Sequence, residues 1–373
     1  MNPLTFDISH QSSQCGARIG RVTTPHGSFD TPAFMPVGTK ASVKGLLPEQ
    51  VAQTGAQIIL NNTYHLMLRP GTELISRLGG VHGFMGWQGP ILTDSGGYQV
   101  FSLSNISLID DDGVTFRSEV DGAQVRLTPE SSIRAQNEIG ADIIMAFDDC
   151  PPGTSDAARR GFAVDRTIRW LERCARAHQR TDQALFGIVQ GGTDLELRTR
   201  CAEAVRGIDL PGYAIGGVAV GEGFEQMLSI VRHTAPLLPP EKPRYLMGVG
   251  YERDILEAVR AGVDMFDCVL PTRNGRNANA FTRQGPIRLR NTRYSEDDAP
   301  IEEGCDCRAC ASFSRAYLRH LFQAEEMLGP ILVTLHNLRH YQRLMLDIRA
   351  AIRDDDWSCL RSRWPVLSQS QEP

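Results

Sequence analysis

The stretch IGADIIMAFDD, residues 139–149, contains the pattern that decides the fold of this chain. Its glycine ends a segment with helical spacing at 129–140, as glycines commonly do just past a helix. The apolar run that follows lacks strict alternation of apolar and polar residues, which is typical of a strand buried on both faces of a parallel sheet. The run closes on two carboxylates, Asp148 and Asp149.

The same helix-then-strand unit recurs along the chain. Repeated units of this kind predict a parallel sheet, and eight of them predict an α/β fold in which the sheet closes into a (β/α)₈ barrel, the TIM barrel. An open doubly wound sheet is the alternative, although no GxGxxG motif opens a helix after the first run. The apolar runs lie at 33–39, 57–63, 90–96, 142–149, 185–192, 213–219, 244–250 and 264–271.

Two segments interrupt this rhythm. Residues 113–128 alternate around an Asp-Gly pair, which predicts a β-hairpin inserted after the third strand. Residues 272–345 contain a cluster of cysteines and are interpreted as a metal-binding insertion. We therefore expect a single barrel domain over residues 1–373 that carries this insertion near its C-terminus.

The composition, 41% hydrophobic and 22% charged over 373 residues, is that of an ordinary globular protein. No run approaches the ~18 apolar residues of a membrane span, and the N-terminus lacks the features of a signal peptide. We therefore expect a cytoplasmic protein with no membrane partner. The net charge of −5 gives no global signal for nucleic acid. Residues 268–295, however, hold six arginines and no Asp or Glu, which suits phosphate binding as well as a solvated surface.

The cysteine cluster has the spacing C-x-C-x₂-C, formed by Cys305, Cys307 and Cys310. Thiolates this close can hold one tetrahedral zinc ion, and a fourth protein ligand would close the site and make it structural. Spacing alone leaves that ligand open among three histidines, although His320 and His340 look more like surface residues on helices. An iron–sulfur cluster is the competing interpretation, but it usually requires a fourth cysteine, and Cys359 is distant in sequence. The candidate histidines are His320, His336 and His340.

Most of the predicted strands end in polar residues or glycine. In a closed barrel these ends meet at one face, where active sites lie. Each residue alone has a structural explanation, but several carboxylates and an amide at one mouth indicate chemistry. The residues are Asn61, Asn62, Asp94, Ser95, Asp148, Asp149, Gln190, Gly216, Gly217 and Asp267.

Two carboxylates across such a mouth suit a reaction at an anomeric carbon, with one as nucleophile and one moving protons. Asp267 lies in an apolar run, and partial desolvation favours its role as nucleophile if hydrogen-bond donors keep it ionised. Asp148 and Gln190 together match the edge of a guanine-like base. Gly216 and Gly217 permit a peptide N–H to approach the 6-oxygen of that base. Tyr98 and Met247 would stack on the base from either side, unless they are plain core residues.

These motifs together resemble the bacterial tRNA-guanine transglycosylases (queuine tRNA-ribosyltransferases). The resemblance runs from TPAFMPVGT at 31–39 to HN at 336–337. It includes NNTYHLMLRPG, LTDSGGYQVFSL, MAFDDC, GIVQGG, GGVAVGE, YLMGVG, DMFDCVLPTRNGRNA and CDCRAC. The family implies a (β/α)₈ barrel with a zinc-binding insertion that acts as a homodimer on one tRNA. No ATP or redox cofactor is implied.

The resemblance also implies roles for individual residues. Asp267 would be the nucleophile and Asp94 the general acid/base. The substrate-binding set would be Asp94, Ser95, Gly96, Gly97, Tyr98, Asp148, Gln190, Gly217, Val218 and Met247. The RNA-contacting set would be Gly248, Val249, Gly250, Tyr251, Glu252, Arg253, Asp254, Thr272, Arg273, Asn274, Gly275 and Arg276. One structural Zn²⁺ per subunit would be held by Cys305, Cys307, Cys310 and His336.

The implied reaction replaces guanine at the anticodon wobble position through a covalent glycosyl-enzyme intermediate, in queuosine biosynthesis. The incoming base would be 7-aminomethyl-7-deazaguanine; the alternative is queuine, for which Val220 of GGVAVGE leaves little room. Two other classes remain as rivals. A zinc-assisted barrel hydrolase needs an open metal site at the mouth, and a non-catalytic zinc RNA-binding protein leaves the three mouth carboxylates unexplained.

Overall fold

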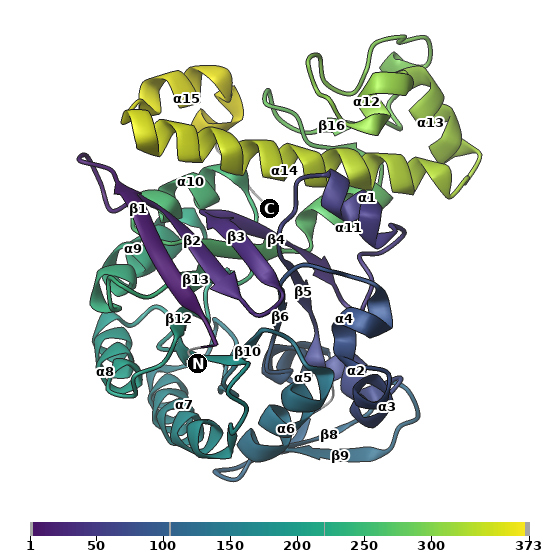
Figure 1. The fold of residues 1–373 in the computed structure, drawn as a ribbon. Helices are drawn as coiled ribbons and strands as arrows, with labels where there is room; N and C mark the ends of the chain where they lie inside the picture. The colour runs from purple at the N-terminus through teal and green to yellow at the C-terminus, as the bar shows by residue number, and fades with distance from the viewer. Residues whose placement is uncertain (1–2, 104–105, 220, 370–373) are drawn as a thin grey trace.

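The protein is described here from a computed structural model, which covers residues 3–103, 106–219 and 221–369. Among these residues, eight parallel strands close into a barrel because the last strand, β14, pairs with the first, β4 (Figure 1). Each predicted apolar run overlaps one of them, so the predicted barrel is confirmed and the open sheet was wrong. The strands are β4 (Ala33–Gly38), β5 (Ile59–Asn61), β6 (Ile91–Thr93), β10 (Ile143–Met145), β11 (Ala184–Val189), β12 (Gly212–Ile215), β13 (Arg244–Leu246) and β14 (Met265–Cys268).

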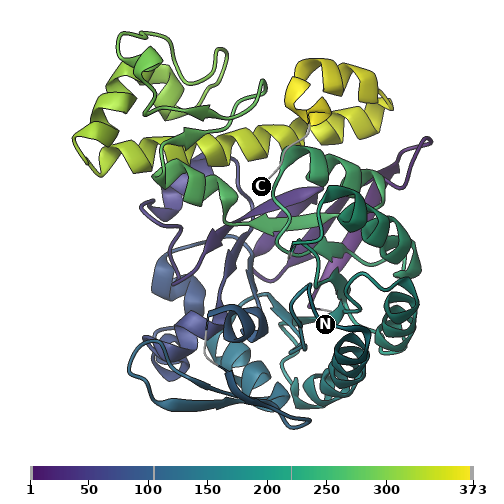
Figure 2. The ribbon, with the colours of Figure 1, turned by 180° about the vertical axis from the view of Figure 1, so that it is seen from behind.

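Helices surround this barrel on its outer side (Figure 2). The helix before β10 shows how the sequence sets the boundaries. Thr128 accepts a hydrogen bond from the Ser131 N–H at its start, and Gly140 ends it in the left-handed region at φ 81°. The helices that follow the barrel strands are α1 (Pro48–Gln53), α2 (Thr63–Leu68), α3 (Thr72–Arg77), α4 (Gly80–Met85), α5 (Gly97–Leu103), α6 (Pro129–Ile139), α7 (Ala157–Ala177), α8 (Leu195–Arg206), α9 (Phe224–Thr234), η1 (Ala235–Leu237) and α10 (Glu252–Arg260).

Strand residues alternate between two apolar cores, which explains why the sequence shows no alternation. In β10, Ile143 and Met145 belong to the cluster inside the barrel, whereas Ile144 packs outward against the helices. A sheet that the sequence analysis missed, of β1 (Thr5–Gln11), β2 (Arg18–Thr24) and β3 (Gly27–Thr31), adds Val22 and Phe29 to the inner cluster. His26, in the turn of this sheet, binds Asp142 just before β10, so the sheet closes the barrel end opposite the polar one.

The predicted hairpin after the third strand is present as β8 (Val114–Arg117) and β9 (Gln124–Leu127), which pair antiparallel. Strand β7 (Ile106–Ile109) adds to its edge. Within the described ranges, no helix is both long enough and apolar enough to cross a lipid bilayer.

The C-terminal part is organised around one long helix, α14, which runs between the barrel and the segments that carry the cysteines (Figure 1). This helix begins inside the predicted insertion and continues to Asp354. The remaining elements are α11 (Leu270–Arg276), β15 (Asn279–Ala280), β16 (Ile287–Arg288), η2 (Thr292–Tyr294), α12 (Arg308–Ser312), α13 (Arg315–Gln323), α14 (Leu328–Asp354), α15 (Trp357–Arg363) and η3 (Pro365–Ser368).

Candidate active site

The polar strand ends meet at the C-terminal mouth of the barrel, and direct contacts link them. Ser95, next to Asp94, directs its hydroxyl to the Asp148 carboxylate at 3.5 Å, and Gln190 Nε2 donates to Asp148 at 2.7 Å. A Cβ on Gly216 would lie 3.6 Å from the Met247 sulfur and 2.9 Å from Gln190 Nε2. The structure therefore brings the ends of β6, β10, β11, β12 and β13 into one site.

Asp94 is buried and held by four donors. Its Oδ1 accepts from the backbone N–H of Thr63 at 2.9 Å and of Gly96 at 3.2 Å. Its Oδ2 accepts from the Asn62 amide and, at 2.8 Å, from Gln99 Nε2. Burial nevertheless outweighs these donors and raises the pKa of Asp94 to about 6. A carboxyl with a pKa this close to neutrality can both accept and return a proton.

Asp148, Gln190 and Gly217 form a continuous row. Asp148 is only 5% exposed, and burial raises its pKa to about 6. Gln190 is 1% exposed, and its Oε1 has no hydrogen-bond partner among the described residues. Gly217 has φ +63° and approaches so closely that a Cβ there would lie 2.2 Å from Gln190 Oε1. A buried acceptor without a donor is rare in a folded protein, and this oxygen lies against the backbone of Gly217.

Asp148→Asn is expected to stabilise the fold at pH 8. A carboxyl whose folded pKa lies above its unfolded value takes up protons on folding, so it destabilises the protein above about pH 6 and has no effect below about pH 3.8. The shift from 3.8 to about 6 corresponds to about 3 kcal/mol. Urea unfolding of the wild-type protein and of the Asp148→Asn variant at pH 8 and pH 4 measures this difference in the free energy of unfolding. An equal difference at both pH values would show that the carboxyl is not strained by burial.

Asp267 lies in β14, and one of its oxygens is fixed by two donors. Oδ1 accepts from the Tyr245 hydroxyl at 2.6 Å and from the Gly248 N–H at 2.8 Å. Oδ2 receives no hydrogen bond from the part of the chain that the structure describes. Burial raises the pKa of Asp267, and the two donors oppose that effect. The carboxylate in the apolar run of β14 therefore has one oxygen, Oδ1, fixed by hydrogen bonds from the described residues and a second, Oδ2, that is not.

Tyr245 is a site residue that the sequence analysis missed, because a tyrosine inside an apolar run reads as core. It is fully buried in β13. Burial raises its pKa far above the usual value, and the charges of both Asp267 and Asp94 act in the same direction. Asp94 directly follows β6 and Asp267 lies near the end of β14, so both carboxylates belong to the C-terminal ends of barrel strands.

The other predicted substrate and RNA residues are placed unevenly. Tyr98 is 53% exposed on α5, whereas Val218 is buried. In the predicted RNA-contacting set, Arg273 is exposed and Arg276 is half-buried. Glu252 is fully buried and pairs with His340 at 2.9 Å, so its side chain is not presented to a ligand. The members that are also buried are Val249, Gly250, Thr272 and Gly275.

The cysteine cluster is assembled with the histidine of α14 that the family resemblance implies. His336 Nδ1 lies 3.7, 3.5 and 3.3 Å from the sulfurs of Cys305, Cys307 and Cys310. All four ligand atoms lie within 4.8 Å of one another. The Nε2 of the buried ring is 2.7 Å from the Phe281 carbonyl, which accepts its proton and leaves the Nδ1 lone pair to face the sulfurs. The site can bind a metal ion.

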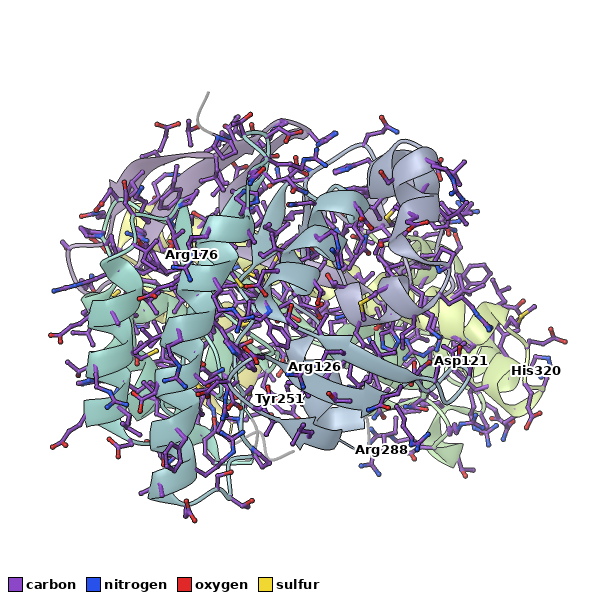
Figure 3. The ribbon with its side chains drawn as sticks, turned by 90° about the horizontal axis from the view of Figure 1, so that it is seen from below. Asp121, Arg126, Arg176, Tyr251, Arg288 and His320 are labelled. Atoms are coloured by element: carbon purple, nitrogen blue, oxygen red, sulfur yellow. The ribbon has the colours of Figure 1, made fainter. Side chains whose placement is uncertain are left out.

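The two remaining candidate histidines have different surroundings. His320 is exposed on α13, at the outer edge of the molecule (Figure 3). The prediction that His340 lies at the surface was wrong, because the ring is fully buried and bound to Glu252. Helical periodicity did not reveal this, because α14 is covered by the barrel on one side and by the cysteine-bearing segments on the other.

Comparison with known proteins agrees with this geometry. A family model described as queuine tRNA-ribosyltransferase matches residues 13–366. A queuine tRNA-ribosyltransferase of Thermus thermophilus is 54% identical over 354 residues, which is 95% of this chain and 91% of that protein. The protein of the same name from Herpetosiphon aurantiacus is 54% identical over 98% of this chain and 92% of its own length. That of Syntrophobacter fumaroxidans is 52% identical over 99% of both chains.

Proposed function

Because the chain belongs to the queuine tRNA-ribosyltransferase family, we propose that it exchanges guanine at the anticodon wobble position of tRNA for 7-aminomethyl-7-deazaguanine. It is thus a pentosyltransferase that exchanges a guanine base in tRNA, in the queuosine pathway. The choice of incoming base and the covalent intermediate are the proposed parts. The single observation that supports them is that Asp267, near the end of β14, has both of its hydrogen bonds from the described residues on Oδ1, while Asp94 follows the end of β6.

The proposed reaction has two displacements at the ribose anomeric carbon. In the first, Asp267 Oδ2 forms a bond to that carbon while the bond to guanine N9 breaks, and the protonated Asp94 gives its proton to the leaving guanine. In the second, Asp94 removes the N9 proton of the incoming base, whose nitrogen then displaces Asp267. Each displacement inverts the carbon, so the product retains the original configuration. The covalent step keeps the ribose in place while the bases exchange.

Base recognition follows from the row beside these carboxylates. An ionised Asp148, held in place by Gln190 Nε2, accepts hydrogen bonds from guanine N1–H and N2–H₂. The Gly217 N–H would donate to the 6-oxygen, with Tyr98 and Met247 on the faces of the ring. The target nucleotide must leave its stack to enter such a mouth, so a splayed anticodon loop is the expected substrate. Arg273 and Arg276 would neutralise the flanking phosphates.

The metal site fits zinc. Three thiolates and one imidazole make a closed tetrahedral set, so the ion would be structural, with one per subunit. A homodimer on one tRNA, as the family resemblance implies, completes the proposal.

A base-exchange assay tests this function. tRNA preloaded with labelled guanine is expected to release the label when 7-aminomethyl-7-deazaguanine is added, and much less when queuine is added. Val220, on which the discrimination against queuine was predicted, lies outside the described residues. Equal rates with both bases would overturn the choice of incoming base. Tight tRNA binding with no release of label would favour a non-catalytic RNA-binding protein.

Tyr245→Phe is expected to lower exchange at neutral pH by roughly 10- to 100-fold, the effect of losing one hydrogen bond to a charged group. The tyrosine hydroxyl lowers the pKa of Asp267, so its loss leaves more of the nucleophile protonated. The acidic limb of the pH–rate profile should therefore move to higher pH, with activity partly restored in alkaline buffer. Tyr213→Phe is the matched control, because that buried hydroxyl bonds the Ile208 carbonyl instead. An unchanged profile would contradict the role of Tyr245.

A further inference from the structure

Arg198, on α8, is a fully buried cation that forms no ion pair with a carboxylate among the described residues. All of its hydrogen bonds go to backbone carbonyls instead. Nε donates to Gly192 at 2.9 Å, Nη1 to Val189 at 2.9 Å and to Gly216 at 2.7 Å, and Nη2 to Gly217 at 3.1 Å. These carbonyls satisfy the donors of Arg198 but do not neutralise its charge, and burying a charge without a partner of opposite sign costs stability, so packing alone does not explain the arrangement.

The carbonyls that Arg198 binds belong to the row that would read the base. The peptide bonds at Gly216 and Gly217 are trans, because the described cis bonds lie elsewhere. In a trans peptide the C=O and N–H groups point in opposite directions. The guanidinium therefore draws the Gly216 carbonyl to one side and turns the Gly217 N–H to the other. That N–H has no acceptor among the described residues, and Gly217 touches the Gln190 amide.

A cation bound to a carbonyl strengthens the N–H of the same peptide as a donor, because hydrogen bonds in series polarise one another in a low-dielectric site. Arg198 remains charged at neutral pH, although burial lowers its pKa to about 10. The charges of nearby groups, Glu222 among them, oppose that lowering. The positive charge is thus available to the peptide and to an oxygen bound in front of it.

We propose that Arg198 is a positioning residue that orients and polarises the Gly216–Gly217 peptide, so that the site selects bases with an oxygen at C6. This inference rests on the proposed function, because it takes the Gly217 N–H to be the donor to that oxygen. A purely structural arginine would hold the two strand ends without regard to which base is bound.

The test is a cycle of one substitution in the protein against one change of ligand. Guanine and 2-aminopurine differ by the 6-oxygen and by the N1 proton, and only the oxygen is assigned to the Gly217 N–H, since the N1 proton is assigned to Asp148. Binding of 2-aminopurine is followed by its fluorescence, and binding of guanine is measured by competition. Arg198→Met is expected to lower the affinity for guanine by about tenfold, which corresponds to the loss of about one hydrogen bond. The affinity for 2-aminopurine is expected to change by less than about twofold. Arg244→Met is the matched control: a buried arginine bound to the Leu238 and Gly262 carbonyls, outside the mouth.

Equal weakening of both bases, or no change in either, would overturn the role of Arg198. If the methionine variant does not fold, Arg198→Lys takes its place. Lysine keeps the charge but cannot reach both carbonyls in fork geometry, so a smaller loss confined to guanine is expected, and equal effects would again contradict the proposal. Wild-type protein that binds guanine no better than 2-aminopurine would instead show that the proposed base recognition is wrong.

Discussion

Asp267→Asn is expected to lower base exchange by at least ~10⁴-fold, the scale on which loss of a catalytic nucleophile acts. The amide keeps the shape of the carboxylate and can still accept from Tyr245 and Gly248, but it cannot form an ester with the ribose. The measurement is the exchange rate of labelled guanine, together with a denaturing gel that separates a protein–tRNA adduct from free tRNA. Both signals should disappear.

The loss should not come from unfolding. Burial raises the pKa of Asp267, so the charged carboxylate is a destabilising group at neutral pH, and its replacement should leave thermal stability equal or higher. Binding of free base should also persist, because the row of Asp148, Gln190 and Gly217 is intact. Exchange that continues at more than a few per cent of the wild-type rate would rule out Asp267 as the nucleophile.

His336→Ala is expected to remove the metal and unfold the segments around the cysteine cluster. Apparent binding energies of structural zinc are about 10–16 kcal/mol, more than the small apolar cluster around Leu289, Leu318 and Phe322 can replace. The damage should extend to the mouth through α14. The next residue, Asn337, donates to the Pro271 carbonyl beside the nucleophile strand, and Tyr341 donates to the Gly250 carbonyl at 2.5 Å. We therefore expect the rate of base exchange in tRNA to fall more than the affinity for the free base.

Elemental analysis and thermal unfolding check this prediction. His320→Ala is the matched control, since that histidine is exposed on α13 and should leave one zinc per chain. A variant at His336 that retains stoichiometric zinc would show that another residue completes the site. One that loses zinc without any change in unfolding would show that the ion is not structural.

Much of the fold was predictable because it depends on local pattern. The eight strands are short and apolar, and glycines such as Gly140 mark where helices stop. The N-terminal sheet was missed because β1 is largely exposed and carries no core signal of its own. The choice of His336 over His340 required the family resemblance, since both are buried on one helix four residues apart.

The candidate site was predictable where its residues break a pattern, and missed where they follow one. Asp94, Asp148 and Asp267 are polar residues in or after apolar runs, so they can be identified from the sequence pattern. Tyr245 reads as core, and Arg198 reads as one of many surface arginines on a helix. Their roles arise from burial and from partners distant in sequence, which no local pattern records. Burial also raises the pKa of Asp94 and Asp148, so these carboxylates lower the free energy of unfolding at neutral pH while their proton affinity suits the proposed reaction.

Locating the covalent bond tests most directly whether the mouth acts through Asp267. Protein incubated with tRNA would be denatured rapidly, digested with nuclease and protease, and analysed by fragment mass spectrometry. We predict a ribose-linked nucleotide on the peptide that contains residues 264–276, attached to the Asp267 carboxylate. A ribose on Asp94 or Asp148, or guanine release without any adduct on a carboxylate, would contradict that prediction.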